Sequence, residues 1–446
     1  MDSQRRNEIV LLCAVGAITA LGMALVSVAL GDSPLRATRG VALAGALLAI
    51  TFLMDLTGQK RDRALVPIIA MICGLGLIML WRLDRPAHQA SVQIIWMVLG
   101  ASLMLATYLL ITDVRGLARM KYICGVGAVG LLFATMIWGE ERYGARLWLD
   151  LGIIPPFQPG EFAKILMAIF LAGYVAERGQ LISEVGRGRW GLPILELRHL
   201  APVLAIVVFC LALFVTQRDL GAAVLFLGLA IAVMYLGTGR RTYVLLGAAA
   251  FVIGALIAPH LFAHVGKRIV AWLYPYSAPT GVGMQSLQAM FAFSEGGLLG
   301  TGLGMGMPYK MPAVATDLIF AAIGEELGLA GTCGLLALFA MATFTGMRIA
   351  WRCQDRFGML LAAGLTTVIA LQALVIVGGV IRVVPLTGIT LPFVSYGGTS
   401  VITSFIMVGL LLAVSRDCWE PPHVRRHVVR HPAPSAGDPG PTQPVS

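Results

Sequence analysis

Long apolar runs constrain this chain more than any other feature. They recur from Ile9 to Ser415, and only 13% of the 446 residues are charged. Runs of about 18 or more apolar residues are long enough to cross a membrane. In lipid, an open chain satisfies its backbone hydrogen-bonding groups only as a helix. The sequence therefore predicts an all-α fold, a polytopic bundle of transmembrane helices.

The length of the apolar runs predicts about twelve spans. Their cores lie near residues 9–30, 40–56, 65–81, 91–112, 121–138, 162–177, 199–216, 220–237, 242–263, 317–345, 358–384 and 399–415. The first run is too long for the core of a signal peptide, so we expect a retained helix. A long loop, residues 263–316, precedes the tenth span.

The basic residues indicate the orientation. Most of the 33 Lys and Arg residues fall in alternate loops, for example Lys60, Arg61 and Arg63. The positive-inside rule then places both termini in the cytoplasm and the loops 139–161, 263–316 and 384–400 outside. The net charge of +10 is spread over short loops, so we predict no nucleic-acid partner. Residues 417–446 have the composition of a disordered cytoplasmic tail.

The cysteines give no pattern of paired or metal-binding residues. Five of the seven fall inside apolar runs, and Cys353 and Cys418 fall in basic segments that we place in the cytoplasm. We expect no disulfide framework. The absence of a CxxC pair or a His cluster predicts no zinc site.

The first outer loop carries Arg146, Glu161 and Lys164. Glu161 suits the first turn of a helix, and Lys164 lies one turn further on the same face. These residues form either a helix start with a surface ion pair, or a site where Arg146 and Lys164 bind an anionic head group. Asp219, between two spans, is either a functional acid or part of a turn that satisfies itself.

The long outer loop carries Lys267, Arg268 and Lys310, with closely spaced glycines at residues 296–304. Such glycines favour an anion-binding nest of backbone N–H groups or a flexible linker. Asp317 follows, just before an apolar run, where Thr316 or Asp317 is expected to cap the helix. A helix N-terminus favours the charged form of an acid.

Two further acids, Glu325 and Glu326, lie about two turns into the same apolar run. Acids at this depth are costly unless they are paired or face water. In the last outer element, residues 383–400, prolines and glycines prevent a continuous helix, which favours a backbone that lines a cavity. Tyr396 in this element is either an interface anchor or a substrate contact.

These motifs together resemble the RodA/FtsW/SpoVE family, the shape, elongation, division and sporulation proteins. The matching stretches occur in the family's order: GARLWLDLGIIPPFQPGEFAK, TQRDLGA, GGLLGTGLG, TDLIFAAIGEELG and PLTGITLPFVSYGGTS. The resemblance implies a membrane core at residues 65–416. The two helices of residues 1–64 are then an N-terminal addition, and residues 417–446 a tail.

The resemblance implies a peptidoglycan glycosyltransferase that polymerises lipid II at the outer face of the cytoplasmic membrane. The family's essential acid maps onto Asp317, which we predict to be the catalytic general base. A class B penicillin-binding protein is the implied partner. The residues predicted to bind substrate are Arg146, Glu161, Lys164, Asp219, Lys267, Arg268, Lys310 and Ser395.

Other functions remain open from the sequence. The runner-up is a lipid II flippase or transporter, for which Glu325 and Glu326 would be the mid-membrane charges. A non-catalytic scaffold is the third. No cofactor is predicted, although a divalent cation stays open. The two extra helices favour an elongation, RodA-like role over a division role.

Overall fold

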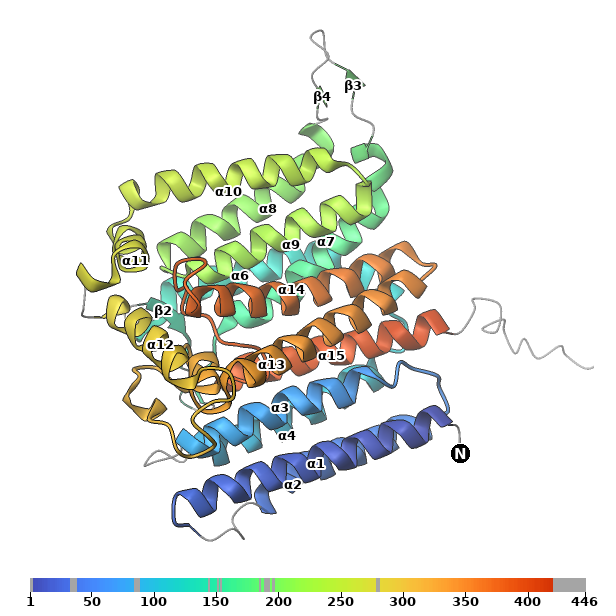
Figure 1. The fold of residues 1–446 in the computed structure, drawn as a ribbon. Coiled ribbons are helices and arrows are strands. Elements are labelled where there is room, and N and C mark those ends of the chain that lie inside the picture. The colour runs from blue at the N-terminus through green and yellow to red at the C-terminus, as the bar shows by residue number, and fades with distance from the viewer. Residues whose placement is uncertain are drawn as a thin grey trace, which may run out of the picture.

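Figure 1 shows a bundle of long helices lying side by side. The computed structural model describes residues 3–32, 38–83, 89–142, 145–150, 152, 155–183, 186–187, 193–194, 197–277 and 281–419. Most of the predicted tail, residues 420–446, lies outside the described residues.

The predicted all-α membrane bundle is confirmed, and each predicted span coincides with a helix. These helices are α1 (Ser3–Ala29), α2 (Thr38–Leu56), α3 (Leu65–Leu83), α4 (Gln89–Leu110), α6 (Lys121–Trp138), α7 (Pro159–Ser183), α8 (Leu197–Thr216), α9 (Leu220–Thr238), α10 (Arg241–Leu261), α13 (Ile319–Arg352), α14 (Arg356–Val380) and α15 (Gly398–Trp419). In the described part of the chain, eleven helices are long and apolar enough to cross a membrane, and Gly40–Leu56 of α2 is a shorter apolar helix.

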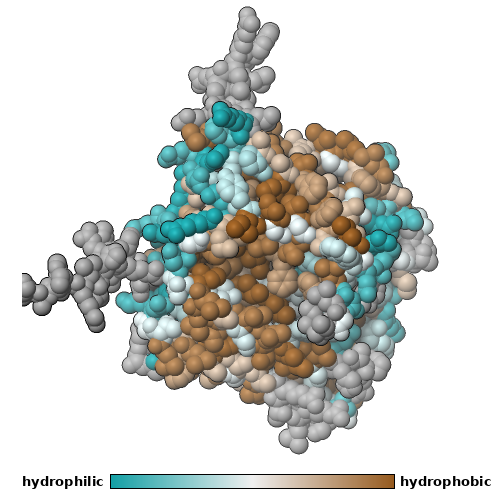
Figure 2. All heavy atoms as spheres, turned by 180° about the vertical axis from the view of Figure 1, so that it is seen from behind, coloured by the Kyte–Doolittle hydropathy of each residue, from teal (hydrophilic) through white to brown (hydrophobic). Residues whose placement is uncertain are grey.

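The outside of the bundle is apolar. In Figure 2, hydrophobic residues form a broad area on one face, with hydrophilic residues toward its sides. On α10, side chains such as Leu245 (70% exposed) and Leu256 (67% exposed) face outward. Exposed apolar patches of this extent suit lipid rather than water, as expected for a multi-pass membrane protein.

Short elements occupy the connections. They are α5 (Arg115–Arg119), α11 (Ala263–Leu273), η2 (Pro275–Ser277), α12 (Val282–Gly296) and η3 (Pro308–Lys310), with the antiparallel pairs β1 (Glu140–Arg142)–β2 (Ala145–Trp148) and β3 (Gly186–Arg187)–β4 (Pro193–Ile194). In Figure 1, α11 and α12 lie together at one end of the bundle, where α10 ends. The predicted outer loops are thus partly ordered by local backbone hydrogen bonds.

The two N-terminal helices lie at one edge of the bundle (Figure 1), with α1 against α3 and α2 against α4. Their predicted inner end is fixed by buried charges. Arg61 donates to Glu8 at 2.7 Å and lies 3.4 Å from Asp55. Removing one partner of such a pair would leave an uncompensated buried charge. The division at residue 64 remains a proposal about domain organisation.

Helix α13 is broken at Gly328, where φ is 67° and ψ is −164°. The residues after α12 fill this break, and we call residues 297–307 the glycine loop. Backbone N–H groups of the loop donate to the carbonyls of Glu325 (2.9 Å) and Glu326 (3.1 Å), and its carbonyls accept from Leu329 (2.9 Å) and Ala330 (3.1 Å). The loop thus satisfies the backbone groups that the broken helix cannot satisfy itself.

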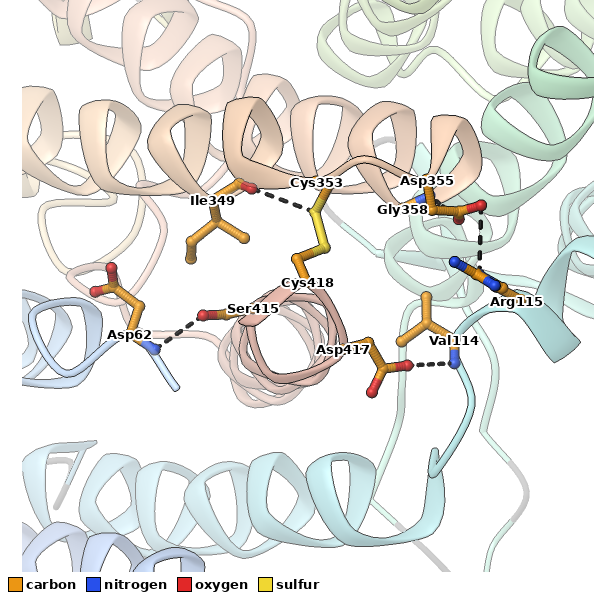
Figure 3. The surroundings of a disulfide bond; sticks show 10 residues. All are labelled: Asp62, Val114, Arg115, Ile349, Cys353, Asp355, Gly358, Ser415, Asp417 and Cys418. Carbon is orange, nitrogen blue, oxygen red and sulfur yellow. Dashed lines mark hydrogen bonds and ion pairs between the residues drawn. A yellow bond between two sulfur atoms is a disulfide. The ribbon is translucent and has the colours of Figure 1, made fainter. Parts of the chain in front are cut away.

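A disulfide bond joins Cys353, just after α13, to Cys418 in the last turn of α15 (Figure 3). The expectation that the cysteines stay unpaired is therefore wrong for this pair, while the other five cysteines are free. The two Cα atoms lie 4.9 Å apart, although 65 residues separate them in sequence. Helix packing creates this proximity, and no local motif signals it.

Contacts around the disulfide hold α15 to neighbouring loops. Ser415 accepts a hydrogen bond from the N–H of Asp62 at 2.8 Å, and Asp417 accepts one from the N–H of Val114 at 2.9 Å (Figure 3). This end of α15 is therefore fixed both by the disulfide and by hydrogen bonds from loop N–H groups to its side chains.

Candidate functional site

Asp317 lies in a turn between η3 and α13, residues 311–318, which we call the Asp317 turn. The carbonyl of Ala313 accepts hydrogen bonds from the N–H groups of Thr316 (3.2 Å), Asp317 (2.9 Å) and Leu318 (3.2 Å). Helix α13 begins at Ile319, and its N-cap residue, Leu318, makes no side-chain capping bond. The prediction that Thr316 or Asp317 caps the helix is wrong, because both residues belong to the preceding turn.

A cation from another element acts on this acid. Arg268 of α11 donates to the carbonyls of Leu386 (3.1 Å) and Thr387 (2.6 Å). At Gly388, a Cβ atom would lie 3.7 Å from Arg268 Nη2 and 3.7 Å from Asp317 Oδ2. The guanidinium and the carboxylate therefore border the same glycine, so three segments distant in sequence meet at one point.

The environment raises the pKa of Asp317 above its ordinary value. Burial is the main cause, and it is opposed by a hydrogen bond from Thr316 and by the positive charge of Arg268. The expectation that a helix N-terminus would favour the charged form is wrong in direction, because partial burial outweighs the stabilising groups. An acid with a raised pKa is better suited to accept a proton near neutral pH.

Ser395 links the last outer element to the Asp317 turn. Its hydroxyl accepts from the N–H of Leu391 at 2.9 Å and donates to the carbonyl of Thr316. The neighbouring N–H of Tyr396 donates to the carbonyl of Ala315 at 2.8 Å. Ser395 is only 1% exposed, so in this structure its hydroxyl is engaged within the protein and holds the turn in place.

Glu161 and Lys164 form a buried ion pair in the first turns of α7. Lys164 Nζ lies 2.8 Å from Glu161 Oε2 and donates to Gln372 Oε1 at 2.8 Å. Lys164 is 2% exposed and Glu161 is 9% exposed. The predicted ion pair exists, but it is buried rather than at the surface, since neighbouring parts of the protein cover both charges.

Asp219 is the N-cap of α9, and its carboxylate accepts from the N–H of Ala222 at 2.9 Å. Burial raises its pKa, and the charge of Glu161 adds to this effect, while Lys164 and Arg268 oppose it. Arg268 therefore interacts with two acids, because the charges of both Asp219 and Asp317 act on it. The structure brings Asp219, Arg268 and Asp317 into one electrostatic cluster.

The remaining predicted cations lie on the surface. Arg146 is exposed on β2, Lys267 is exposed on α11 beside Arg268, and Lys310 is exposed at the end of η3. In contrast to these exposed cations, Arg268 is held beside Gly388 by bonds to two backbone carbonyls.

Glu325 and Glu326 bind the glycine loop. Glu326 accepts from the N–H of Gly304 at 2.9 Å, and Glu325 accepts from the N–H of Met307. Arg82 of α3 donates to Glu326 at 2.7 Å and to the carbonyl of Gly306 at 2.8 Å. These two backbone N–H groups therefore bind carboxylates of the protein itself.

Sequence reasoning did not find Arg82. It is a basic residue in the last turn of α3, at the end of an apolar run, which is the usual place of an interfacial anchor. Its partner lies 244 residues away in the sequence. The costly pair of acids at Glu325 and Glu326 was the only signal that a buried cation was required.

The profile of a family described as "Cell cycle protein" (FTSW_RODA_SPOVE) matches residues 63–419. The peptidoglycan glycosyltransferase RodA of Mycobacterium tuberculosis is 36% identical over 440 residues, which cover 95% of this chain and 93% of that protein. The stage V sporulation protein E of Bacillus subtilis is 36% identical over 284 residues, which cover 62% of this chain and 73% of that protein.

Solved structures have the same fold. One is a chain of a peptidoglycan synthase complex that coordinates polymerisation and crosslinking, with a TM-score of 0.65 and 27% identity, covering 81% of this chain and 99% of that one. The rod shape determining protein RodA of Thermus thermophilus has a TM-score of 0.58 at 24% identity, with the same coverage.

Proposed function

Since the chain belongs to the RodA/FtsW/SpoVE family and is a membrane-embedded peptidoglycan glycosyltransferase, we propose that it polymerises lipid II with Asp317 as the general base. The observation that supports this role most directly is the meeting of the Asp317 carboxylate and the Arg268 guanidinium at Gly388. The carboxylate does not cap a helix, and its raised pKa suits proton transfer.

In the proposed reaction, Asp317 takes the proton of the GlcNAc 4-hydroxyl of one lipid-linked chain. The resulting oxygen nucleophile attacks the anomeric carbon of the other chain with inversion, and the bond to undecaprenyl diphosphate breaks. A positioned general base contributes about 10²–10⁴-fold to such a step.

The leaving diphosphate needs positive charge. Arg268 supplies a cation whose position is fixed by two backbone carbonyls, so it needs little reorganisation during the reaction. Lys267, Lys310 and Arg146 are exposed and suit the initial attraction of an anionic head group. Glu161, Lys164 and Asp219 are buried, so we assign them a supporting role.

The proposal also includes orientation and partner. The positive-inside rule favours cytoplasmic termini, which puts the Asp317 turn at the outer face of the cytoplasmic membrane. A class B penicillin-binding protein would crosslink the glycan. The similar synthase complex, in which polymerisation and crosslinking are coordinated, supports this expectation.

The transporter alternative relied on Glu325 and Glu326 as mid-membrane charges. Both acids have partners within the protein, Met307 for the first and Arg82 and Gly304 for the second. This pairing leaves neither acid as the unpaired mid-membrane charge on which the transporter alternative relied.

The decisive test is lipid II polymerisation by the purified chain with its penicillin-binding partner. We expect Asp317→Asn to lower the rate by about 10²-fold or more, since the amide cannot accept the proton. Glu295→Gln is the matched control, because Glu295 is an exposed carboxylate on α12 of the same outer face. Equal glycan synthesis by wild type and Asp317→Asn would refute the assignment, and added chelator tests the divalent cation.

A further inference from the structure

Arg82 and Glu326 form a buried ion pair that also binds the glycine loop. The side chains are 8% and 0% exposed, and Arg82 Nε lies 2.7 Å from Glu326 Oε1. Each partner makes a second bond to the loop, Arg82 to the carbonyl of Gly306 and Glu326 to the N–H of Gly304. The pair therefore offers the loop one donor and one acceptor in a fixed arrangement.

The glycine loop leads through η3 into the Asp317 turn. The N–H of Met307 donates to Glu325, and η3 follows with bonds from Lys310 to the carbonyl of Met307 (3.1 Å) and from Met311 to that of Pro308 (3.0 Å). Met311, the first residue of the Asp317 turn, is 5% exposed. The loop and η3 thus form a continuous hydrogen-bonded path to that turn.

The other end of the Asp317 turn is the first part of α13, which carries Glu325 and Glu326. The chain from Gly304 to Glu326 is therefore closed on itself by the bond between these two residues. Asp317 lies within this closed segment, between the glycine loop at one end and α13 at the other.

Helix α1 packs against the same loop. Leu303 contacts the buried cluster of Met23, Val26 and Ile78, and a Cβ atom at Gly304 would lie 2.6 Å from the Cβ of Ala29. The residues of α1 precede the segment 63–419 that the family profile matches. In this chain, the N-terminal helix therefore restricts how far the loop can move.

We propose that Arg82 and Glu326 are positioning residues of the glycosyltransferase, which fix the glycine loop and thereby the place of the Asp317 carboxylate. This inference rests on Asp317 as the proposed general base. Misplacement of a reacting group by about 1 Å can cost about 10²-fold in rate, so small loop shifts are sufficient to impair turnover.

A charge swap, Arg82→Glu with Glu326→Arg, separates positioning from mere stabilisation. The swapped pair can still form an ion pair between α3 and α13. However, Arg at position 326 cannot accept from the N–H of Gly304, and Glu at position 82 cannot donate to the carbonyl of Gly306. We expect thermal stability to recover in the swap relative to each single variant, while kcat stays about 10-fold or more below wild type.

Arg82→Lys provides a milder variant, because Lys keeps the charge opposite Glu326 but lacks the fork that also reaches Gly306. Deuterium exchange in peptides covering residues 297–311 should be faster than in wild type, and kcat should fall with little change in KM. The matched control is Arg61→Lys, which alters a buried ion pair with Glu8 at the opposite end of α1. We expect it to leave loop exchange and kcat unchanged.

The inference is overturned if the swap restores kcat together with stability, or if Arg82→Lys leaves both kcat and loop exchange at wild-type values. Where the swap does not fold, the Lys variant decides. Wild-type activity in Asp317→Asn would reject Asp317 as the base. Faster loop exchange in Arg82→Lys would still show that the ion pair orders the glycine loop. If Asp317→Asn is inactive while Arg82→Lys has wild-type kcat and loop exchange, the positioning role alone is rejected.

Discussion

Replacing Gly328 with alanine should separate the glycine loop from α13. The φ and ψ of Gly328, 67° and −164°, fall in a region that is essentially restricted to glycine. An added Cβ would also lie 2.3 Å from the backbone nitrogen of Gly300 and 2.7 Å from the carbonyl of Leu298. Backbone atoms cannot rotate away as a side chain can, so the loop and the helix must move apart.

The cost of this change follows from the contacts at the break. Four backbone hydrogen bonds join the loop to residues 325–330, and each contributes about 0.5–1.5 kcal/mol. Alanine in this backbone conformation adds about 1–3 kcal/mol of strain. If all four bonds are lost, Gly328→Ala should therefore destabilise the protein by about 3–9 kcal/mol.

The assay compares thermal unfolding of purified protein with the matched variant Gly334→Ala. Gly334 lies in the same helix, and a Cβ there would meet nothing within 4 Å. Alanine at this helical position should be neutral or stabilising by up to about 1 kcal/mol. If Gly328→Ala unfolds at the temperature of Gly334→Ala and polymerises lipid II normally, the argument that the loop requires this glycine is refuted.

Two further predictions concern the active-site charge and the disulfide. Arg268 opposes the rise in the Asp317 pKa, so Arg268→Gln should raise that pKa further. Because the base acts when deprotonated, the acid limb of the kcat/KM profile should then move to higher pH. A move to lower pH would contradict this prediction. Cys418→Ser removes the disulfide and should lower the free energy of unfolding by about 2–4 kcal/mol in non-reducing buffer. The same change at the free Cys333 should have little effect. Equal losses in both variants would show that the crosslink does not stabilise the fold.

The number and position of the spans could be predicted from the sequence, because lipid makes apolar run length a direct signal of helix. Asp317 could be singled out from its motif. Its surroundings could not, since the partial burial that raises its pKa comes from segments distant in the sequence. A local argument from the helix N-terminus gave the opposite direction.

The break at Gly328 and the buried pairing of Arg82 with Glu326 could not be predicted from the sequence for a related reason. Residues 317–345 form one apolar run, and nothing in its composition marks a point where the helix stops and restarts. At the break, the glycine loop supplies hydrogen bonds that a continuous helix would make within itself. Such pairings between distant segments leave no periodic signal along the chain.

Helix α1 also sets a length scale. Two of its buried polar residues bind other helices or loops: Glu8 binds Arg61, and Ser27 accepts from the indole N–H of Trp81 at 2.9 Å. These residues are 19 positions apart in the sequence, or about 29 Å along a helix at about 1.5 Å per residue. That distance is close to the hydrocarbon thickness of about 30 Å. Polar contacts near both of its ends thus fix α1 to the rest of the bundle. A thinner or thicker bilayer must therefore deform around the bundle or tilt it as a whole, because α1 cannot tilt separately.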